Sequence, residues 1–350
     1  MQLEPLDDID GLRDEWNALA EQARNPFSTW EWASTWWRHF ADGHERIVMA
    51  AREPEGKLLA LLPLCVSSRG PLRVLRFIGY GPADRLGPVC DPAARESVAL
   101  AFERLLSSSR LRWTVLLGDH FPGEQQWSTL LDATVLGREA SPLLRFEGRS
   151  WEELLASRST NFRQQVRRRE RKLAKSFELR FRLSDDVERL RDDFATLVRL
   201  HELRWSGGGS EAFPEKVRAF HEDFAVLALE RGWLRLWLLE LDGEPVAAWY
   251  GFRFAGADWF YQSGRDPAYE DLNVGFVLMA HTVRDAAEAR MSEYHLLRGD
   301  EPYKARFASE DPGLETIAVG RGRLARTSLA AAAALPGRGP RAARRLLAGD

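Results

Sequence analysis

The sequence predicts an α+β protein of two consecutive units, each a twisted, mostly antiparallel sheet flanked by helices. The chain has 350 residues, 45% of them hydrophobic, which is enough to give two domains a core each. The same order of expected elements, helices, an antiparallel meander, a helix and a strand, also occurs twice along the chain. Length and repetition together therefore indicate a tandem architecture.

The first copy begins with helical spacing of apolar residues over residues 26–40, where Ser28 or Thr29 is available as the N-cap. A second helix is expected to open at Asp91, because Pro92 then occupies the first helical position, where a missing N–H costs nothing. The expected strands of this copy are residues 46–52, 57–66, 72–80 and 111–118.

The second copy is expected to follow a boundary near residues 148–159. Its helices are predicted over residues 187–205, 213–231 and 275–289, and its strands over 233–241, 245–254, 258–263 and 293–297, with Asp242 and Gly243 as a hairpin turn. The predicted domains are thus 1–150 and 151–325. The remaining residues, 326–350, are rich in Arg, Ala, Gly and Pro and are expected to form a poorly ordered tail.

Composition excludes several classes of protein. A net charge of −3 provides no overall basic field for nucleic acid or membranes. Two cysteines, Cys65 and Cys90, are too few for a disulfide framework or a cysteine zinc site, and the seven histidines lack metal-ligand spacing, so no metal is predicted. The acidic N-terminus lacks an apolar signal segment, and no run reaches the roughly 20 apolar residues of a membrane span. These features predict a cytoplasmic protein.

Residues 259–307 carry the clearest chemical signal. A strand ends in Gly264, and a polar loop leads to a helix beginning beside Gly275, where unpaired N–H groups favour an anionic phosphate. The later segment 299–304, GDEPYK, follows a strand end, where side chains project into a cleft. Its carboxylates, tyrosine and lysine are residue types that can act as general acids and bases. A helix capped by Asp300 is the purely structural alternative.

In their order and spacing, five segments together resemble the GCN5-related N-acetyltransferase (GNAT) superfamily. The resemblance is to the BioF2-like acetyltransferase domain of CelD-type (cellulose biosynthesis-associated) proteins. The FemABX peptidyltransferases, which contain two GNAT-like domains, are wider relatives. The resemblance covers most of residues 26–320. The segments are FSTWEWASTWW at 27–37, NFRQQVRRRERKL at 161–173, LHELRW at 200–205, YQSGRDPAY at 261–269 and LLRGDEPYK at 296–304.

The resemblance implies an acyl-CoA (acetyl-CoA) co-substrate, whose pyrophosphate would be held by Asn273, Val274, Gly275 and Phe276. It also implies that Tyr303 is the general acid. Asp300 and Glu301 are candidate bases, and Lys304 is a candidate to stabilise an oxyanion or hold an anionic acceptor. One departure from the family pattern is that Glu270, Asp271 and Leu272 occupy the front of the phosphate loop, where acidic groups would repel a pyrophosphate.

Further candidates concern the acceptor. Residues 158–182 hold ten Arg or Lys against two Glu, which indicates either a solvated helix face or a strip that binds a phosphorylated acceptor or a tRNA acceptor stem. Arg163 and Arg167 are its candidate contacts. On the helix 187–205, His201, Arg204 and Trp205 share one face, with Arg204 as a possible acceptor clamp and His201 as a proton shuttle. Tyr261 completes the substrate-binding set.

Three functions follow from these features. The first is an N-acyltransferase moving an acyl group, expected to be acetyl, from acyl-CoA to an amine of a small or carbohydrate-linked acceptor. In this case the first domain is catalytically silent and forms one wall of the acceptor cleft. The second is a FemABX-like transferase that uses aminoacyl-tRNA. The third is a catalytically degenerate binding partner in polysaccharide biosynthesis or export, supported by the acidic Glu270 and Asp271.

Overall fold

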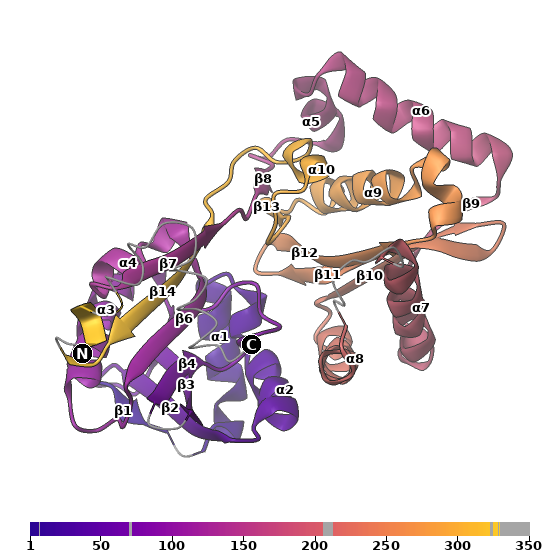
Figure 1. Cartoon of the computed structure of the whole chain (residues 1–350). Coiled ribbons are helices and arrows are strands. Elements are labelled where there is room, and N and C mark those ends of the chain that lie inside the picture. Colours follow the sequence, from indigo (N-terminus) through magenta and orange to yellow (C-terminus); the bar gives the residue numbers. More distant parts are fainter. Residues whose placement is uncertain (7, 70–71, 206–212, 323–324, 328, 330–350) are drawn as a thin grey trace. The chain divides into compact units, whose positions relative to one another are not determined.

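The computed structural model describes residues 1–6, 8–69, 72–205, 213–322, 325–327 and 329 (Figure 1). It divides into two compact units. One comprises residues 1–141 together with the segment that starts at 312, and the other comprises residues 142–311. Most of the predicted tail, 326–350, lies outside the described residues.

The first unit contains a sheet whose strands lie in the order β1-β2-β3-β4-β6-β14-β7, with β5 paired to β3. Its pairings are antiparallel except for β4 with β6, which is parallel. The strands are β1 (Glu4–Pro5), β2 (His44–Arg52), β3 (Leu58–Arg69), β4 (Leu72–Phe77), β5 (Val89–Cys90), β6 (Val115–Pro122), β7 (Thr134–Glu139) and β14 (Leu314–Gly320).

Helices α1 (Arg13–Gln22), α2 (Trp30–Phe40), α3 (Arg95–Ser107) and α4 (Trp127–Leu130) belong to the same unit. Thr29, rather than Ser28, caps α2, since its Oγ1 accepts from the Trp32 N–H at 3.3 Å. Asp91 caps the short 3-10 turn before α3, with its Oδ1 2.7 Å from the Ala93 N–H. The predicted N-terminal signals at these two helices are therefore present.

The second unit contains a sheet in the order β8-β13-β12-β11-β10-β9, antiparallel except for β12 with β13. Helix α9 covers one face and α7 and α8 the other, while α6 packs against α9 (Figure 1). The elements are β8 (Leu143–Arg145), α5 (Trp151–Ser157), α6 (Thr160–Ser176), β9 (Leu179–Leu183), α7 (Val187–Trp205), α8 (Glu215–Glu230), β10 (Leu234–Leu241), β11 (Glu244–Phe254), β12 (Ala257–Arg265), α9 (Val274–Glu288), β13 (Glu293–His295) and α10 (Pro302–Ala305).

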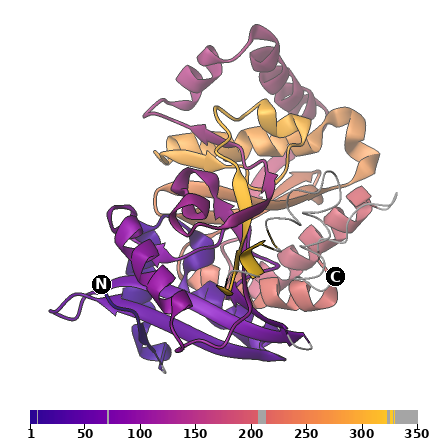
Figure 2. The ribbon, with the colours of Figure 1, turned by 60° about the vertical axis from the view of Figure 1, so that its left-hand side comes forward.

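The predicted fold class is confirmed, because both units are mostly antiparallel sheets flanked by helices. The division of the chain differs from the expected boundaries at 150 and 325. Strand β8 precedes residue 150 yet pairs with β13, and the chain later returns to the first unit, where β14 inserts between β6 and β7 (Figures 1 and 2). Both boundaries are set by strand pairing, which local sequence signals do not reveal. Among the described helices, none is long and apolar enough to cross a membrane.

Strand β11 is packed closely against β12 at a bulge between Tyr250 and Gly251. A Cβ atom at Gly251 would lie 1.9 Å from the Trp259 carbonyl oxygen and 2.6 Å from the Trp249 ring. Because backbone cannot move aside as an exposed side chain can, only glycine fits here.

We therefore expect Gly251→Ala to lower the free energy of unfolding of the second unit by about 2 kcal/mol or more. Gly137→Ala in β7 is the matched control, since a Cβ there meets no atom within 4 Å. Urea unfolding followed by tryptophan fluorescence measures both. Equal stability of the two variants would show that the bulge is not tightly packed.

Candidate active site

The parallel strands β12 and β13 are paired only over the first three residues of β12. Ala257, Asp258 and Trp259 pair with residues 293–295, and β13 then ends while β12 continues for six residues to Arg265. This part of β12 is paired with β11 but not with β13, and it contributes Ser263, Gly264 and Arg265 to a cavity of about 360 Å³. The other lining residues are Arg169, Arg204, Ala248, Trp249, Glu270, Asn273, Gly275, Phe276, Leu278, Met279, Tyr303, Arg306 and Phe307.

Helix α9 begins at this cavity. Asn273 adopts a left-handed conformation with φ 56°, and its carbonyl accepts from the N–H groups of Phe276 and Val277 at 3.0 and 3.1 Å. The N–H groups of Val274 and Gly275 have no hydrogen-bond acceptor within the described ranges. A Cβ on Gly275 would meet its nearest neighbour, Arg265 Cδ, at 3.4 Å. Two donors and the positive end of the helix dipole therefore remain for an anion.

Two guanidinium groups lie over the ring of Phe276 in the first turn of α9. Those of Arg169 and Arg306 are 4.7 and 4.6 Å from its centroid. Arg306 also donates to Gln165 Oε1 at 2.6 Å, but in the part of the chain that the structure describes neither arginine forms an ion pair. Burial, together with the positive charge of Arg306, lowers the pKa of Arg169. An anion in the cavity would relieve this repulsion.

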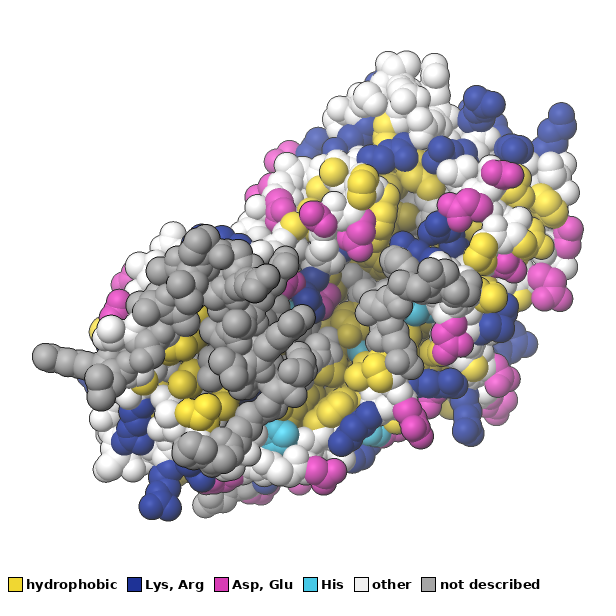
Figure 3. Space-filling view, in the orientation of Figure 1, with side chains coloured by type: hydrophobic (Ala, Val, Ile, Leu, Met, Phe, Trp, Pro, Cys, Tyr) yellow, Lys and Arg dark blue, Asp and Glu magenta, His cyan; other side chains and the backbone are white. Residues whose placement is uncertain are grey.

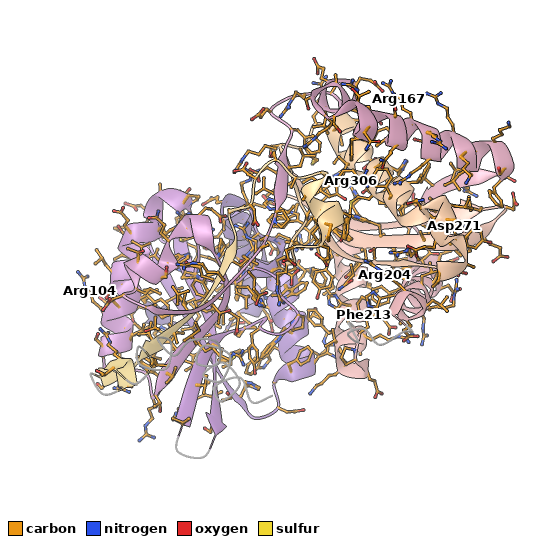
Figure 4. The ribbon with its side chains drawn as sticks, turned by 45° about the horizontal axis from the view of Figure 1, so that its top comes forward. Arg104, Arg167, Arg204, Phe213, Asp271 and Arg306 are labelled. Carbon is orange, nitrogen blue, oxygen red and sulfur yellow. The ribbon has the colours of Figure 1, made fainter. Side chains whose placement is uncertain are left out.

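The acidic front of the loop is partly neutralised. Arg265 donates to both carboxylate oxygens of Glu270, with Nη2–O distances of 2.9 Å. Asp271 is exposed and does not line the cavity (Figure 4). Thus the repulsion expected from this acidic pair is reduced by an arginine that sequence spacing alone did not single out.

Tyr303 and Arg204 line the cavity together. Arg204 Nη1 donates to Ser263 Oγ at 3.0 Å, which fixes the guanidinium beside β12. Burial and the negative charge of Glu301 raise the pKa of Tyr303 above its usual range, whereas the positive charges of Arg204 and Arg265 oppose that rise. The phenol is therefore protonated at neutral pH and is available as a hydrogen donor.

The rest of the predicted catalytic segment lies off the cavity lining. Lys304 is buried, and its Nζ donates to the Arg298 carbonyl and lies 2.9 Å from Glu301 Oε2. Asp300 is exposed. The alternative in which Asp300 caps the helix is wrong, because Glu301 occupies the N-cap position of α10 and makes no capping hydrogen bond with its side chain. Pro302 is the first residue of α10, as expected.

The predicted acceptor residues Arg163, Arg167, His201 and Tyr261 do not line this cavity. Arg163 Nη1 donates to the Ala156 carbonyl at 2.9 Å, and Arg167 pairs with Glu152 at 2.7 Å on the outer side of α6 (Figure 4). His201 is buried, with Nδ1 3.0 Å from the Ser263 carbonyl oxygen, and burial lowers its pKa. The side chain of Trp205 lies outside the described structure.

Tyr261 is partly buried and belongs to a polar group on β11, β12 and α8. His221 has Nε2 3.0 Å from the Tyr261 hydroxyl and Nδ1 3.3 Å from the Tyr250 hydroxyl. Its ring is completely buried, and burial lowers the pKa of His221 to about 3. A neutral imidazole bridging two tyrosines is a packing device, which accounts for the place of Tyr261 in the fold.

Sequence reasoning did not assign Arg169, Arg265 and Arg306 to the site. Arg169 is one of many cations in its helix. Arg265 lies within the motif at 261–269, and Arg306 lies two residues after the motif at 296–304. Only the fold shows which of these cations converge. No group of three or more His, Cys, Asp or Glu side chains in the described segments is arranged to hold a metal ion.

The segment that builds this cavity also matches a known family. Residues 160–305 match the acetyltransferase (GNAT) domain family. The chain contains a GNAT acetyltransferase domain. This domain match supports an acyltransferase activity for the unit that contains it. No curated protein matches the sequence.

Solved structures support the fold beyond this domain. FemX is 13% identical, with a TM-score of 0.63 over 90% of this chain and 96% of its own. The C-terminal domain of a putative lysylphosphatidylglycerol synthetase from Agrobacterium fabrum is 11% identical, with a TM-score of 0.57 over 90% and 93%. L-PGS from Bacillus licheniformis is 13% identical, with a TM-score of 0.51 over 89% of this chain and 92% of its own. At these identities the likeness concerns the fold alone.

The buried His221 makes the GNAT-containing unit sensitive to acid. An unfolded histidine takes up a proton below pH about 6.5, whereas folded His221 resists protonation until about pH 3. Stability is therefore lost as the pH falls between these values. We expect wild type to lose on the order of 2 kcal/mol more than His221→Gln between pH 7 and pH 4.5, because glutamine keeps two polar ends but does not titrate. Urea unfolding at each pH measures this, and parallel losses would contradict it.

Proposed function

We propose that the protein is an N-acyltransferase that uses acyl-CoA, most simply acetyl-CoA, to acylate an amine of a small or carbohydrate-linked acceptor. The observation that supports this best is the pair of open N–H groups at Val274 and Gly275 beside Arg169 and Arg306. Helix N-termini and guanidinium groups are both suited to phosphate oxygens. A donor pyrophosphate at this end of the cavity would accept hydrogen bonds from the two N–H groups and lie beside the two guanidinium charges.

In this proposal the thioester lies along the part of β12 that has no β13 partner and points toward Tyr303. The acceptor nitrogen attacks the thioester carbonyl carbon, a C–N bond forms, and the C–S bond then breaks. The thiolate leaves with the electron pair of that bond and receives a proton. The acceptor ammonium must lose one proton before attack and another after it, so a base is also needed.

Tyr303 is our proposed acid. Its raised pKa keeps the phenol protonated, although it also makes complete transfer to a thiolate less favourable. Arg204 and Arg265 favour negative charge on the phenol oxygen, so they would lower the barrier to donation as the sulfur departs. The acid role therefore depends on the two arginines as well as on the tyrosine.

Glu301 is our proposed base, acting through water. Its carboxylate is half-exposed and close enough to Tyr303 and Arg204 to influence both. Asp300 is exposed and serves as the weaker candidate. For Lys304 we propose a positioning role in place of direct oxyanion contact, since its amine is tied to the Arg298 carbonyl and to Glu301.

A second candidate donor is aminoacyl-tRNA. Four cations of α6, Arg168, Arg171, Lys172 and Lys175, follow the i, i+3, i+4, i+7 pattern of one helix face, opposite buried Phe162, Val166 and Leu173. All four are exposed and lack ion pairs within the described structure, and Figure 3 shows dark-blue side chains gathered over this helix. Such a stripe suits a nucleic-acid backbone. The fold shared with FemX is compatible with this alternative.

Calorimetric titration with acetyl-CoA, CoA and charged tRNA tests the donor. We expect CoA compounds to bind and Gly275→Glu to weaken that binding at least tenfold through bulk and like charge at the phosphate site. Gly275→Ala is the size control and should bind nearly normally, because a Cβ is tolerated there. Binding of tRNA alone would favour the second donor. Binding of neither would favour a degenerate partner without catalysis.

Tyr303→Phe tests the chemistry. It keeps the ring in place and removes only the phenol proton, so we expect turnover to fall about 10²-fold or more with little change in donor affinity. Steady-state kinetics with a confirmed acceptor, together with calorimetry, separates the two effects. Glu301→Gln should instead change the pH dependence of turnover. Near-normal rates in both variants would remove this segment from the catalytic machinery.

A further inference from the structure

A second cavity adjoins the proposed donor site. Its volume is about 250 Å³, and its lining residues are Arg158, Ser159, Asn161, Phe162 and Arg306. Arg306 lines both cavities. The ring of Phe162 lies 5.9 Å from that of Phe276 and 5.2 Å from that of Phe307, both of which line the first cavity. The two cavities are therefore neighbours across one aromatic cluster.

The guanidinium of Arg158 gives one side of the second cavity a positive charge. This guanidinium is held in place by donating to the carbonyl oxygens of Ala308 and Phe307 at 3.1 and 2.6 Å. Burial lowers the pKa of Arg158. Neither Arg158 nor Arg306 forms an ion pair with any described carboxylate. Other partly buried arginines of this unit do, since Arg182 pairs with Asp193 and Arg253 pairs with Asp258.

We infer that the second cavity binds a phosphate monoester carried by the nucleoside end of the donor, namely the 3′-phosphate of coenzyme A. This inference rests on the proposed acyl-CoA donor and assigns a part of that donor to residues that the acyl-transfer chemistry does not use. A phosphate monoester carries more than one negative charge at neutral pH. The guanidinium groups of Arg158 and Arg306 match that charge, and their remaining N–H groups can donate to its oxygens.

Asn161 provides a sharp test because it lines only the second cavity. It is the second residue of α6, where aspartate is favoured by the helix dipole, and an aspartate keeps the acceptor that Gln165 uses at 2.9 Å. Asn161→Asp should therefore fold normally while placing a negative charge beside the proposed phosphate. Arg191→Gln in α7 changes the net charge equally, on an exposed residue that lines neither cavity, and serves as the control.

The experiment is calorimetric titration of CoA and of 3′-dephospho-CoA into the full chain. We expect wild type and Arg191→Gln to bind CoA at least tenfold more tightly than dephospho-CoA. Asn161→Asp should weaken CoA binding about tenfold while changing dephospho-CoA binding less than twofold. Arg158→Gln should show the same selective loss. Thermal melts establish that each variant is folded.

Equal affinity of wild type for the two ligands would overturn this inference and leave the acyl-CoA donor standing. A preference for CoA that persists in Asn161→Asp and Arg158→Gln would also overturn it, by locating the 3′-phosphate elsewhere. Absence of binding by both ligands would instead remove the acyl-CoA proposal itself. The two failures are therefore distinguishable.

Discussion

The site depends on one constraint, the early end of the pairing between β12 and β13. Three parallel residue pairs fix the two strands, and β12 then continues without its neighbour. Its freed edge contributes to the cavity lining, and α7 is held close on the same stretch. A Cβ on Gly264 would lie 2.4 Å from the His201 nitrogen, so the helix backbone rests directly on the strand. The cavity thus has a rigid wall before any ligand is considered.

Electrostatic balance in the second unit differs between its interior and its cavity. Buried or half-buried Arg182 and Arg253 are matched by carboxylates, as charges removed from water generally must be. Arg169 and Arg306 both lie over the ring of Phe276, and neither pairs with a described carboxylate. Their mutual repulsion costs free energy when no ligand is bound. Such an imbalance is common at ligand sites, because the ligand supplies the missing charge.

The sequence predicted the fold class and the helix start at Gly275, since caps, turns and periodicity are local signals. It also brought Arg204 and Tyr303 into the candidate set, and both line the cavity. It did not distinguish Arg169 from Arg167, two positions earlier on the same helix, because the direction in which each points depends on the packing of α6 against α9. Lys304 was a candidate because of its residue type. Its burial and its hydrogen bond to the Arg298 carbonyl depend on the tertiary structure, so the sequence did not reveal them.

The same distinction between local and tertiary signals bears on where the catalytic unit begins. The family match starts at residue 160, yet β8 pairs with the edge of β13 and α5 lies before that point. Trp151, Leu154 and Leu155 of α5 are buried in the core that also contains Phe162 and Val274. Burying side chains of this size contributes roughly 1.5–3 kcal/mol each. That sum is comparable with the whole stability of a typical domain. The unit that folds around the cavity is therefore residues 142–311, and the family-matched segment alone lacks one edge of its sheet and part of its core.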